Sequence, residues 1–366
     1  DITPTIENCT FKNTTADWGG GMVLYNNASP TITGCTFTNN TTTEGGGGAA
    51  IYIAWGSSPE ISYSVFNANE AVSEEMSGSS GGALYITGAG SEPSITYTEF
   101  TGNSAELGGA IGIGDQAFPT FINDTFSTNS AYAFGGAIWN SLDSHFTVHF
   151  SKFTGNTATD DGDVIISYLE EEPIDATKNW WGQASGPAAG DIVGDVDYTP
   201  WYATATTTED TQKVTVKHGP DVIAYSDTIQ PAIDAASAGD TVNVAAGTYN
   251  ENIIINKRIT LQGAGADNTT ITSAAGSGVI NLTTGGESGT DRMVIKDLKV
   301  TGANYDGLTV TGGLGYITFE NVVATHNNMH GVHIDVATIL KDIKVLGCTF
   351  SNNVGCGMQI GSTGGI

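Results

Sequence analysis

Apolar and polar residues alternate along most of the chain in short runs, which Gly, Asn and Pro interrupt. A period of two with many β-branched residues predicts β-strands, and the periodicity of an amphipathic helix is nearly absent. One pattern recurs in the first half of the chain, an apolar stretch around a Phe followed by an Asn-containing turn. The repeats read PTIENCTFKN, PTITGCTFTN, PEISYSVFNAN, PSITYTEFTGN, PTFINDTFSTN and FTVHFSKFTGN, and their phenylalanines are Phe11, Phe37, Phe66, Phe100, Phe126 and Phe153.

A second ladder has a similar spacing. After each Phe, a glycine leads into an apolar strand, at Gly21, Gly48, Gly82, Gly109, Gly136 and Gly162. Two ladders of one period indicate one structural unit per repeat, and the unit is too short for a four-stranded propeller blade. A coil of a parallel β-helix fits, because like residues then stack about 4.8 Å apart in successive coils. We therefore expect an all-β solenoid with a Phe ladder in its core.

The quoted repeats resemble the right-handed parallel β-helix superfamily typified by pectate lyases. The GGA[IL] and FxxN segments are especially similar to the repeats of polymorphic outer-membrane proteins and other microbial surface proteins. The resemblance covers residues 1 to about 176 and implies a right-handed solenoid. It implies almost nothing about activity.

Two segments interrupt the coils of residues 1–176. Residues 177–202 are rich in aromatic residues and resemble the segment that closes many surface β-helices, where bulky side chains cover the last coil. Residues 203–218 begin with a polar, Thr-rich stretch and predict a linker. The aromatic residues expected in the closing cap are Trp180, Trp181 and Trp201.

Residues 219–366 predict a second β-helical segment. Its start contains a short amphipathic helix, expected over Ile229–Ala236 with Asp227 or Thr228 as its N-cap. This stretch resembles the opening cap of pectate-lyase-like β-helices. New coils follow from Gly307, Gly331 and Gly357.

The order of these parts is unusual, because coils lead into a closing cap, and an opening cap leads into coils without one. Joining residue 366 to residue 1 restores the usual order, with Phe350 and Phe11 lying 27 residues apart, in phase with the repeat. We expect the last coil to pair with the first coil of another copy, head to tail between chains or between tandem repeats. An arbitrary boundary with flanking sequence is the alternative. The residues expected at this seam are Asp1, Ile2, Pro4, Ile6, Cys9, Phe11, Cys348, Phe350, Met358, Ile360 and Ile366.

Three of the four cysteines occupy one repeat position. Across an in-phase seam, Cys348, Cys9 and Cys35 would stack in successive coils. A separation of about 4.8 Å between Cα atoms lies within the range for a disulfide. Three states stay open: a Cys348–Cys9 disulfide across the seam, a Cys9–Cys35 disulfide within the chain, or a ladder of free thiols. Cys356 has no partner at an equivalent position.

Charge limits the classes of partner. The chain has 12 basic and 39 acidic residues, a net charge of −27, and no Lys or Arg between Lys12 and Lys152. Nucleic acids and polyanionic glycans are therefore excluded as expected partners, since both require clustered cations. The sequence contains no apolar run of 18 residues, so we expect no membrane insertion.

The density of Asn-x-Ser/Thr sequons suits a secreted surface protein and predicts an extracellular or cell-envelope location. Because no signal-like segment begins the sequence, the secretion signal is expected outside it. The candidate glycosylation sites are Asn8, Asn13, Asn27, Asn39, Asn40, Asn123, Asn268 and Asn281.

The resemblance to lyases implies a search for a calcium-binding carboxylate cluster with an Arg or Lys base. Arg258 and Arg292 lie near the predicted opening cap, away in sequence from most acidic clusters. We expect these clusters to be solvated acidic turns, with a structural Ca²⁺ site as the alternative. The calcium candidates are Asp160, Asp161, Asp163, Asp191, Asp195 and Asp197, and Glu170, Glu171 and Glu172 lie between them.

Two further patterns admit a binding role. His326, His330 and His333 have a spacing that zinc sites use, although no Cys or carboxylate completes the set within the same turn. Exposed aromatic residues such as Trp55 and Trp139 are candidates for contacts with glycans. For both patterns, ordinary turn or core positions are the simpler interpretation.

Taken together, these patterns predict an extracellular structural protein that assembles head to tail, or as tandem repeats, into a fibre, sheath or surface layer. We expect no enzymatic activity and no cofactor except the candidate Ca²⁺. A β-helical polysaccharide lyase or hydrolase and a surface glycan-binding or adhesion module are the alternatives.

Overall fold

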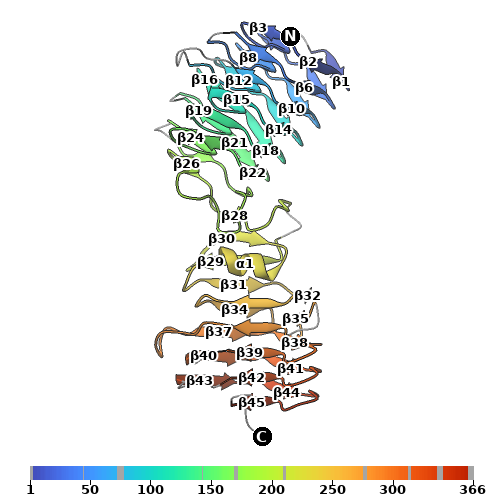
Figure 1. Cartoon of the computed structure of the whole chain (residues 1–366), viewed down its shortest axis with the longest axis vertical. Helices are drawn as coiled ribbons and strands as arrows, with labels where there is room; N and C mark the ends of the chain where they lie inside the picture. The colour runs from blue at the N-terminus through green and yellow to red at the C-terminus, as the bar shows by residue number, and fades with distance from the viewer. Residues whose placement is uncertain are drawn as a thin grey trace. The chain divides into compact units, whose positions relative to one another are not determined.

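The computed structural model describes residues 3–43, 45–71, 78–141, 143–168, 172–208, 212–274, 278–311, 315–335 and 341–361. The chain forms two compact units, Asp1–Thr207 and Thr208–Ile366. In both units the strands of successive coils pair in parallel, as Figure 1 shows. The predicted all-β parallel solenoid is therefore confirmed.

Each complete coil of unit 1 contributes one strand to each of four sheets. The β1 sheet contains β1 (Thr5–Glu7), β5 (Thr31–Thr33), β9 (Glu60–Ser62), β13 (Ser94–Thr96), β17 (Thr120–Ile122), β21 (Thr147–His149), β25 (Ile174–Asp175) and β27 (Val196–Asp197). The β2 sheet contains β2 (Thr10–Lys12), β6 (Thr36–Thr38), β10 (Val65–Asn67), β14 (Glu99–Thr101), β18 (Thr125–Ser127) and β22 (Lys152–Thr154).

The other two sheets of unit 1 follow along each coil. The β3 sheet contains β3 (Thr15–Ala16), β7 (Thr41–Thr42), β11 (Glu70–Ala71), β15 (Ser104–Leu107), β19 (Ser130–Phe134) and β23 (Thr157–Ala158). The β4 sheet contains β4 (Met22–Leu24), β8 (Ile51–Ala54), β12 (Leu84–Thr87), β16 (Ile111–Gly114), β20 (Ile138–Asn140), β24 (Ile165–Ser167) and β26 (Ile192–Val193), and β28 (Trp201–Tyr202) follows later in the unit.

The Phe ladder fills the core of unit 1 as predicted. Its members pair in register, from Phe11 with Phe37 onward to Phe126 with Phe153. Neighbouring rings stack with centroids 4.7 to 5.0 Å apart and nearly parallel planes. Phe37, Phe66, Phe100 and Phe126 are completely buried. Each buried ring therefore touches like rings on both faces.

A ladder of buried amides runs beside the phenylalanines. We define the Asn ladder as Asn40, Asn69, Asn103, Asn129 and Asn156. At each step the backbone N–H and the Nδ2 group of one Asn both donate to Oδ1 of the Asn in the next coil, at 2.9 to 3.1 Å. Nδ2 also donates to the carbonyl of a Phe in the preceding coil. These bonds satisfy polar groups that would otherwise be costly to bury.

A second polar ladder occupies the corner before each strand of the β2 sheet. In this corner ladder, each backbone N–H donates to the side chain at the same position in the next coil, at 2.8 to 3.5 Å. The members are Cys9, Cys35, Ser64, Thr98, Asp124, Ser151 and Asn179. Both ladders point in one direction, with donors facing the later coil.

Coils of unit 2 contribute to three sheets. The first contains β30 (Asp221–Ser226), β29 (Val214–His218), β31 (Thr241–Val244), β34 (Thr260–Gly263), β37 (Met293–Lys296), β40 (Gly315–Glu320) and β43 (Lys341–Leu346). The β32 sheet contains β32 (Gly247–Asn250), β35 (Thr269–Thr272), β38 (Lys299–Thr301), β41 (Val323–Thr325) and β44 (Thr349–Ser351). The β33 sheet contains β33 (Ile253–Ile255), β36 (Ile280–Leu282), β39 (Leu308–Val310), β42 (Val332–Ile334) and β45 (Met358–Ile360).

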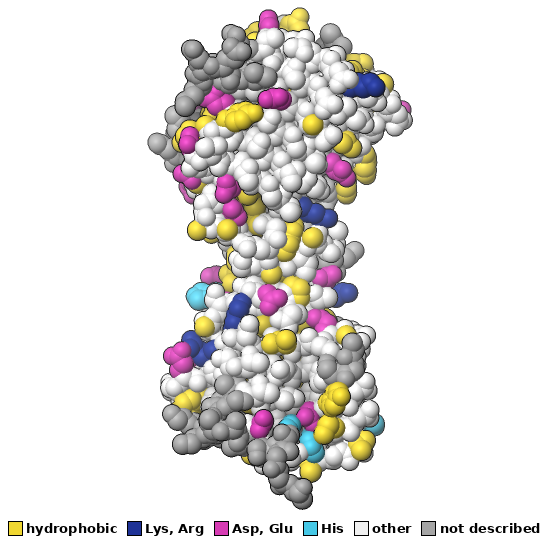
Figure 2. Space-filling model, in the orientation of Figure 1, with side chains coloured by type: hydrophobic (Ala, Val, Ile, Leu, Met, Phe, Trp, Pro, Cys, Tyr) yellow, Lys and Arg dark blue, Asp and Glu magenta, His cyan; other side chains and the backbone are white. Residues whose placement is uncertain are grey.

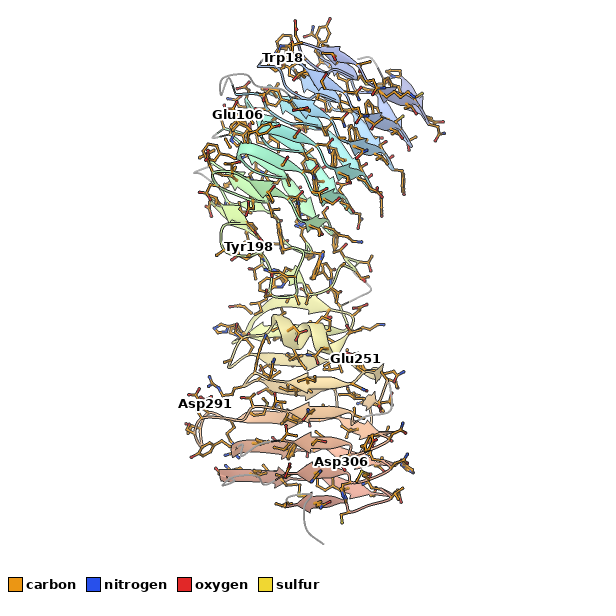
Figure 3. All side chains as sticks on the ribbon, in the orientation of Figure 1. Trp18, Glu106, Tyr198, Glu251, Asp291 and Asp306 are labelled. Atoms are coloured by element: carbon orange, nitrogen blue, oxygen red, sulfur yellow. The ribbon has the colours of Figure 1, made fainter. Side chains whose placement is uncertain are left out.

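The predicted helix is present as α1 (Ile229–Ala235), within one residue of the expected end. Thr228 is the N-cap residue, but its side chain makes no capping hydrogen bond. Instead, the Glu251 carboxylate accepts the N–H groups of Ile229 and Gln230. The ammonium group of Lys257 donates to three carbonyls at the other end of the helix. Both helix ends are thus capped by the first coil, where Figure 3 labels Glu251.

Two predicted boundaries are wrong. The expected linker 203–218 includes β29, which pairs antiparallel with β30 and β31, so residues 214–218 belong to the sheet. The expected closing cap 177–202 includes β26 and β27, which add a further step to the β4 and β1 sheets. Both errors arise because these strands depend on pairing with distant segments, which local composition does not report.

Candidate functional site: two open solenoid edges

The first coil of unit 1 forms an open edge. Within the described chain, β1, β2, β3 and β4 stand at the ends of their sheets and pair on one side. Their inward side chains are less covered than the same positions one coil later. Ile6 and Phe11 are half-buried, whereas Ile32 and Phe37 are 0% exposed. The edge therefore presents core positions and unpaired backbone groups together.

An apolar hollow opens at this edge. It has a volume of about 420 Å³ and lies between the start of the β1 strand and the end of β4. Ile6 and Leu24 are inward core positions of the first coil, and Tyr25 on the rim is 53% exposed. The lining residues are Pro4, Ile6, Val23, Leu24, Tyr25, Asn26, Ala28 and Pro30.

The last coil of unit 2 forms a second open edge. β43, β44 and β45 are the last strands of their three sheets in the described chain. Val345 lies in register with Phe319, and Ile360 with Ile334. Phe319 and Ile334 are fully buried, but Val345 is 41% and Ile360 60% exposed. Met358 and Phe350 are half-buried.

The predicted seam residues thus lie on two open edges, one in each unit. Asp1, Ile2 and Ile366 lie outside the described residues. Three residues that the sequence pattern missed belong to the same edges: Thr14, Val345 and Asn353. The last two were detectable, because Asn353 follows Phe350 at the spacing that separates Asn40 from Phe37, and Val345 continues the inward positions of β43.

All four cysteines are free thiols. Cys9 and Cys35 occupy equivalent positions, but the disulfide between them is not formed, and the Cys35 Sγ accepts the Cys9 N–H. Burial raises the pKa of the Cys35 thiol. The thiols of Cys9 and Cys348 each donate to the carbonyl two residues earlier, at 3.3 and 3.4 Å. Cys9 and Cys348 thus make the same local hydrogen bond.

Several of the acidic candidates accept hydrogen bonds from nearby backbone N–H groups. Asp163 accepts the Ala158 N–H, Asp191 accepts the Ala188 N–H, and Asp197 accepts the Thr199 N–H. Burial raises the pKa of the Asp191 carboxyl, and the nearby Asp163 carboxylate adds to the rise. In the described parts of the chain, no three metal-binding side chains come together. Glu170 and Glu171 lie outside the described residues, and Asp160, Asp161 and Asp195 are exposed.

The two arginines are held by carboxylates of unit 2. Arg258 contacts Glu287 and Asp291, both at 2.8 Å, and Arg292 contacts Asp342 at 2.6 Å. These ion pairs hold Arg258 against a loop and Arg292 against β43. Neither arginine is therefore placed as the unpaired base that the resemblance to lyases implies. Figure 2 shows acidic side chains scattered singly over the visible face, with few basic ones between them.

The three histidines of the HNNMHGVH segment do not converge on one point. Asp306, labelled in Figure 3, accepts the His330 N–H and lies 3.0 Å from His333 Nδ1. His326 pairs instead with the Thr325 hydroxyl. The His333 Nε2 atom is buried and has no hydrogen-bond partner among the residues that the structure describes. The Asp306–His333 pair resembles an oriented base, but its free nitrogen is sealed from solvent.

The sequons differ in accessibility. Asn40 is 0% exposed and its amide belongs to the Asn ladder, so it is not available for glycosylation, and this candidate is withdrawn. Asn123 and Asn281 are half-buried. The exposed candidates are Asn8, Asn13, Asn27, Asn39 and Asn268.

The cap tryptophans have different surroundings. Trp181 is 4% exposed and stacks on Phe153 at 4.8 Å, so it ends the Phe ladder. Trp201 is buried and its Nε1 donates to the Ala184 carbonyl. Trp180 is half-buried and pairs through its backbone with Lys152. Of the candidate aromatics, Trp55 is 61% exposed and Trp139 is half-buried.

A match to a family model supports the fold of unit 1. Residues 3–157 match the family model described as the right handed beta helix region. Among solved structures, the chain is similar to the periplasmic alginate epimerase AlgG, with 9% identity over 93% of this chain and 78% of that chain, at a TM-score of 0.18. A likeness this distant supports no statement about activity. A search of curated proteins found no match. Among the described residues, no helix is long and apolar enough to cross a bilayer.

Proposed function

Since residues 3–157 form a right-handed β-helix region, we propose that the protein is a structural component whose solenoid edges join head to tail. The joint forms between chains or between consecutive repeats of one longer chain, and it builds a fibre, sheath or surface layer. Heterologous contacts of this kind build an extended assembly when the rotation between successive copies does not close a ring. An extracellular or cell-envelope location fits the exposed sequons and the scarcity of cations.

The observation that carries this proposal is the apolar character of both edges. Val345 and Ile360 at one edge and Ile6 and Phe11 at the other occupy core positions that no further coil covers within the described part of the chain. Fully burying one such side chain contributes about 1.5–3 kcal/mol. Several together exceed the smaller estimates of the cost of association, about 4 kcal/mol upward.

The test compares two isoleucines of the β33 sheet. Ile360→Asp places a charge at the open edge and is expected to weaken association about 100-fold, because the joint would bury that charge. Ile254→Asp is the matched control, since Ile254 is 52% exposed on the outer face of β33, at the opposite end of the same sheet from β45. Sedimentation velocity over a range of concentrations, with electron microscopy of the products, measures the effect. Wild-type protein that stays monomeric throughout contradicts the proposal.

A surface glycan-binding module is the second candidate function. Tyr63 and Tyr97 stack face to face at 5.1 Å and are 64% and 52% exposed. Both have left-handed backbone, with φ of 48° and 50°, a conformation that such side chains rarely adopt. The equivalent residues Gly34 and Asn123 are also left-handed, so this backbone belongs to the turn of each coil, and the candidate rests on the exposed aromatic stack. Strictly monomeric protein would favour this second candidate.

A further inference from the structure

The polar ladders reach the open edge of unit 1 with their acceptors facing outward. Thr14 occupies the position before Asn40 in the Asn ladder. Its N–H and its hydroxyl donate to Asn40 Oδ1, at 3.3 and 2.6 Å. The Thr14 hydroxyl thus donates its hydrogen bond to Asn40. The lone pairs of its oxygen face outward and can accept hydrogen bonds from a preceding coil. Cys9 has the same place in the corner ladder, with its own N–H donated to Cys35 Sγ.

The open edge of unit 2 ends in the complementary pattern. Asn327 donates its N–H and Nδ2 to Asn353 Oδ1, at 3.1 and 3.0 Å, and Asn353 Nδ2 donates to the Ala324 carbonyl. This is the geometry of the Asn ladder in unit 1. In that ladder the next acceptor of an Asn N–H and Nδ2 belongs to the following coil. For Asn353, the following coil lies beyond the open edge.

Side chains of unit 2 change toward the unit 1 pattern as the edge is approached. At the ladder position, Ala303 is followed by Asn327 and Asn353. At the corner position, Leu298 and Val322 are followed by Cys348. In the aromatic column, Val300 and Ala324 are followed in register by Phe350. The last coil of unit 2 therefore carries the three residue types that the first coils of unit 1 continue.

We propose that a second copy of the first coil docks on the last coil by continuing both ladders, an inference that rests on the proposed head-to-tail function. Thr14 Oγ1 accepts the Asn353 amide protons, Cys9 Sγ accepts the Cys348 N–H, and Phe11 stacks on Phe350. β1, β2 and β4 pair with β43, β44 and β45. β3 stays unpaired, because unit 2 has three sheets.

The ladders also set the polarity of the joint. Two unit 1 edges facing each other would oppose acceptor to acceptor, and two unit 2 edges would oppose donor to donor. Each leaves buried polar groups without partners, which is costly. A head-to-tail contact alone satisfies both ladders, so specificity comes from rejecting the alternatives as well as from attraction.

Native cysteines test the register. In assembled protein, Cys9 and Cys348 of neighbouring copies would lie in adjacent coils, within the range for a disulfide. Diamide takes up the two electrons and two protons that these thiols lose as the S–S bond forms. We expect a series of disulfide-linked oligomers on non-reducing gels. Their digests should contain a Cys9–Cys348 linked peptide, and the oligomers should be absent for Cys348→Ser. Oligomers linked through Cys9–Cys9 or through Cys356 would overturn the proposed register of the two coils without contradicting assembly. Absence of oligomers before oxidation would overturn assembly itself.

Thr14 tests the hydrogen bonds. Thr14→Val removes the acceptor at constant shape and is expected to weaken association about tenfold, and Thr14→Asn is expected to restore it by continuing the ladder. Thr15→Val is the matched control, because the Thr15 hydroxyl bonds Thr41 on the exposed outer face of the same edge. The ladder contact would be refuted if the two valine variants weakened association equally. It would also be refuted if the protein formed oligomers and neither variant weakened them.

Discussion

Coils of unit 1 have four strands and those of unit 2 have three, although both units stack parallel strands. The difference lies in one segment: β15 occupies Ser104–Leu107 between the β2 and β4 sheets, whereas a turn leads from β38 to β39. Unit 1 fills the core of its four-stranded coils with stacked Phe and buried Asn. Unit 2 uses aliphatic residues such as Ile271 and Val300. The comparison teaches that the residue type of the core ladder differs together with the number of strands in each coil.

The aromatic stack gives the largest expected difference between the units. Phe100→Ala should destabilise by about 3–5 kcal/mol, because Phe100 stacks on rings in both neighbouring coils and the cavity cannot easily collapse. Ile271→Val in unit 2 should cost about 0.5–1.5 kcal/mol. Denaturant midpoints of both variants measure the contrast. Similar losses would contradict the expectation that the larger truncation in unit 1 leaves the larger cavity.

The corner ladder gives the second difference, since it is polar in unit 1 and apolar at Leu298 and Val322 in unit 2. Asp124 is 1% exposed, and burial raises its pKa well above 3.8, while the Thr98 N–H it accepts opposes the rise. Its Oδ2 has no partner. Folding therefore favours the neutral acid. This favourable state is complete below pH 3.8 and is lost as pH rises through the folded-state pKa.

The direction of the Asp124 pKa shift predicts the effect of the substitution Asp124→Asn. The amide keeps the acceptor for Thr98 and cannot ionise, so the variant should be more stable at neutral pH by about 1–3 kcal/mol. Its advantage should shrink as pH falls toward 3.8. Melting temperatures of both proteins at several pH values measure it. An advantage that does not depend on pH would show that ionisation is not the cause.

Metal removal has the smallest expected effect. The carboxylates of Asp163 and Asp191 in unit 1 cap backbone N–H groups, a role that requires no cation. EDTA and added Ca²⁺ should therefore leave the melting temperature of the protein unchanged. A melting temperature that rises with Ca²⁺ and falls again with EDTA would instead indicate a structural cation. If Asp191→Asn abolishes the rise, that cation lies in unit 1 and is a further difference between the units.

Spacing alone predicted the solenoid, because a ladder needs the same residue type in every coil and so leaves a period in the sequence. The Phe positions and α1 were predictable for this reason and from local amphipathicity. The β3 sheet was not predictable, since strands as short as β3 carry no periodic signal. Nor was the burial of Asn40 predictable from its sequon, because ladder residues and exposed turn residues are both Asn.

The seam residues were predictable in part. Phe350 and Cys348 repeat a pattern that unit 1 makes obvious. Thr14 does not look like a ladder residue, because it replaces the amide with a hydroxyl, and only its bonds to Asn40 Oδ1 reveal its place. The linker failed for a different reason: β29 gains its structure from partners at β30 and β31, the latter far along the chain.

The capping of α1 has a consequence for how unit 2 folds. A seven-residue helix is too short to persist alone in water. Its amino end is held by Glu251 and its carboxyl end by Lys257, both of which lie more than 20 residues later, in the first coil. We therefore expect the helix to be stable only when the first coil is folded against it, so the two should lose their structure together on unfolding.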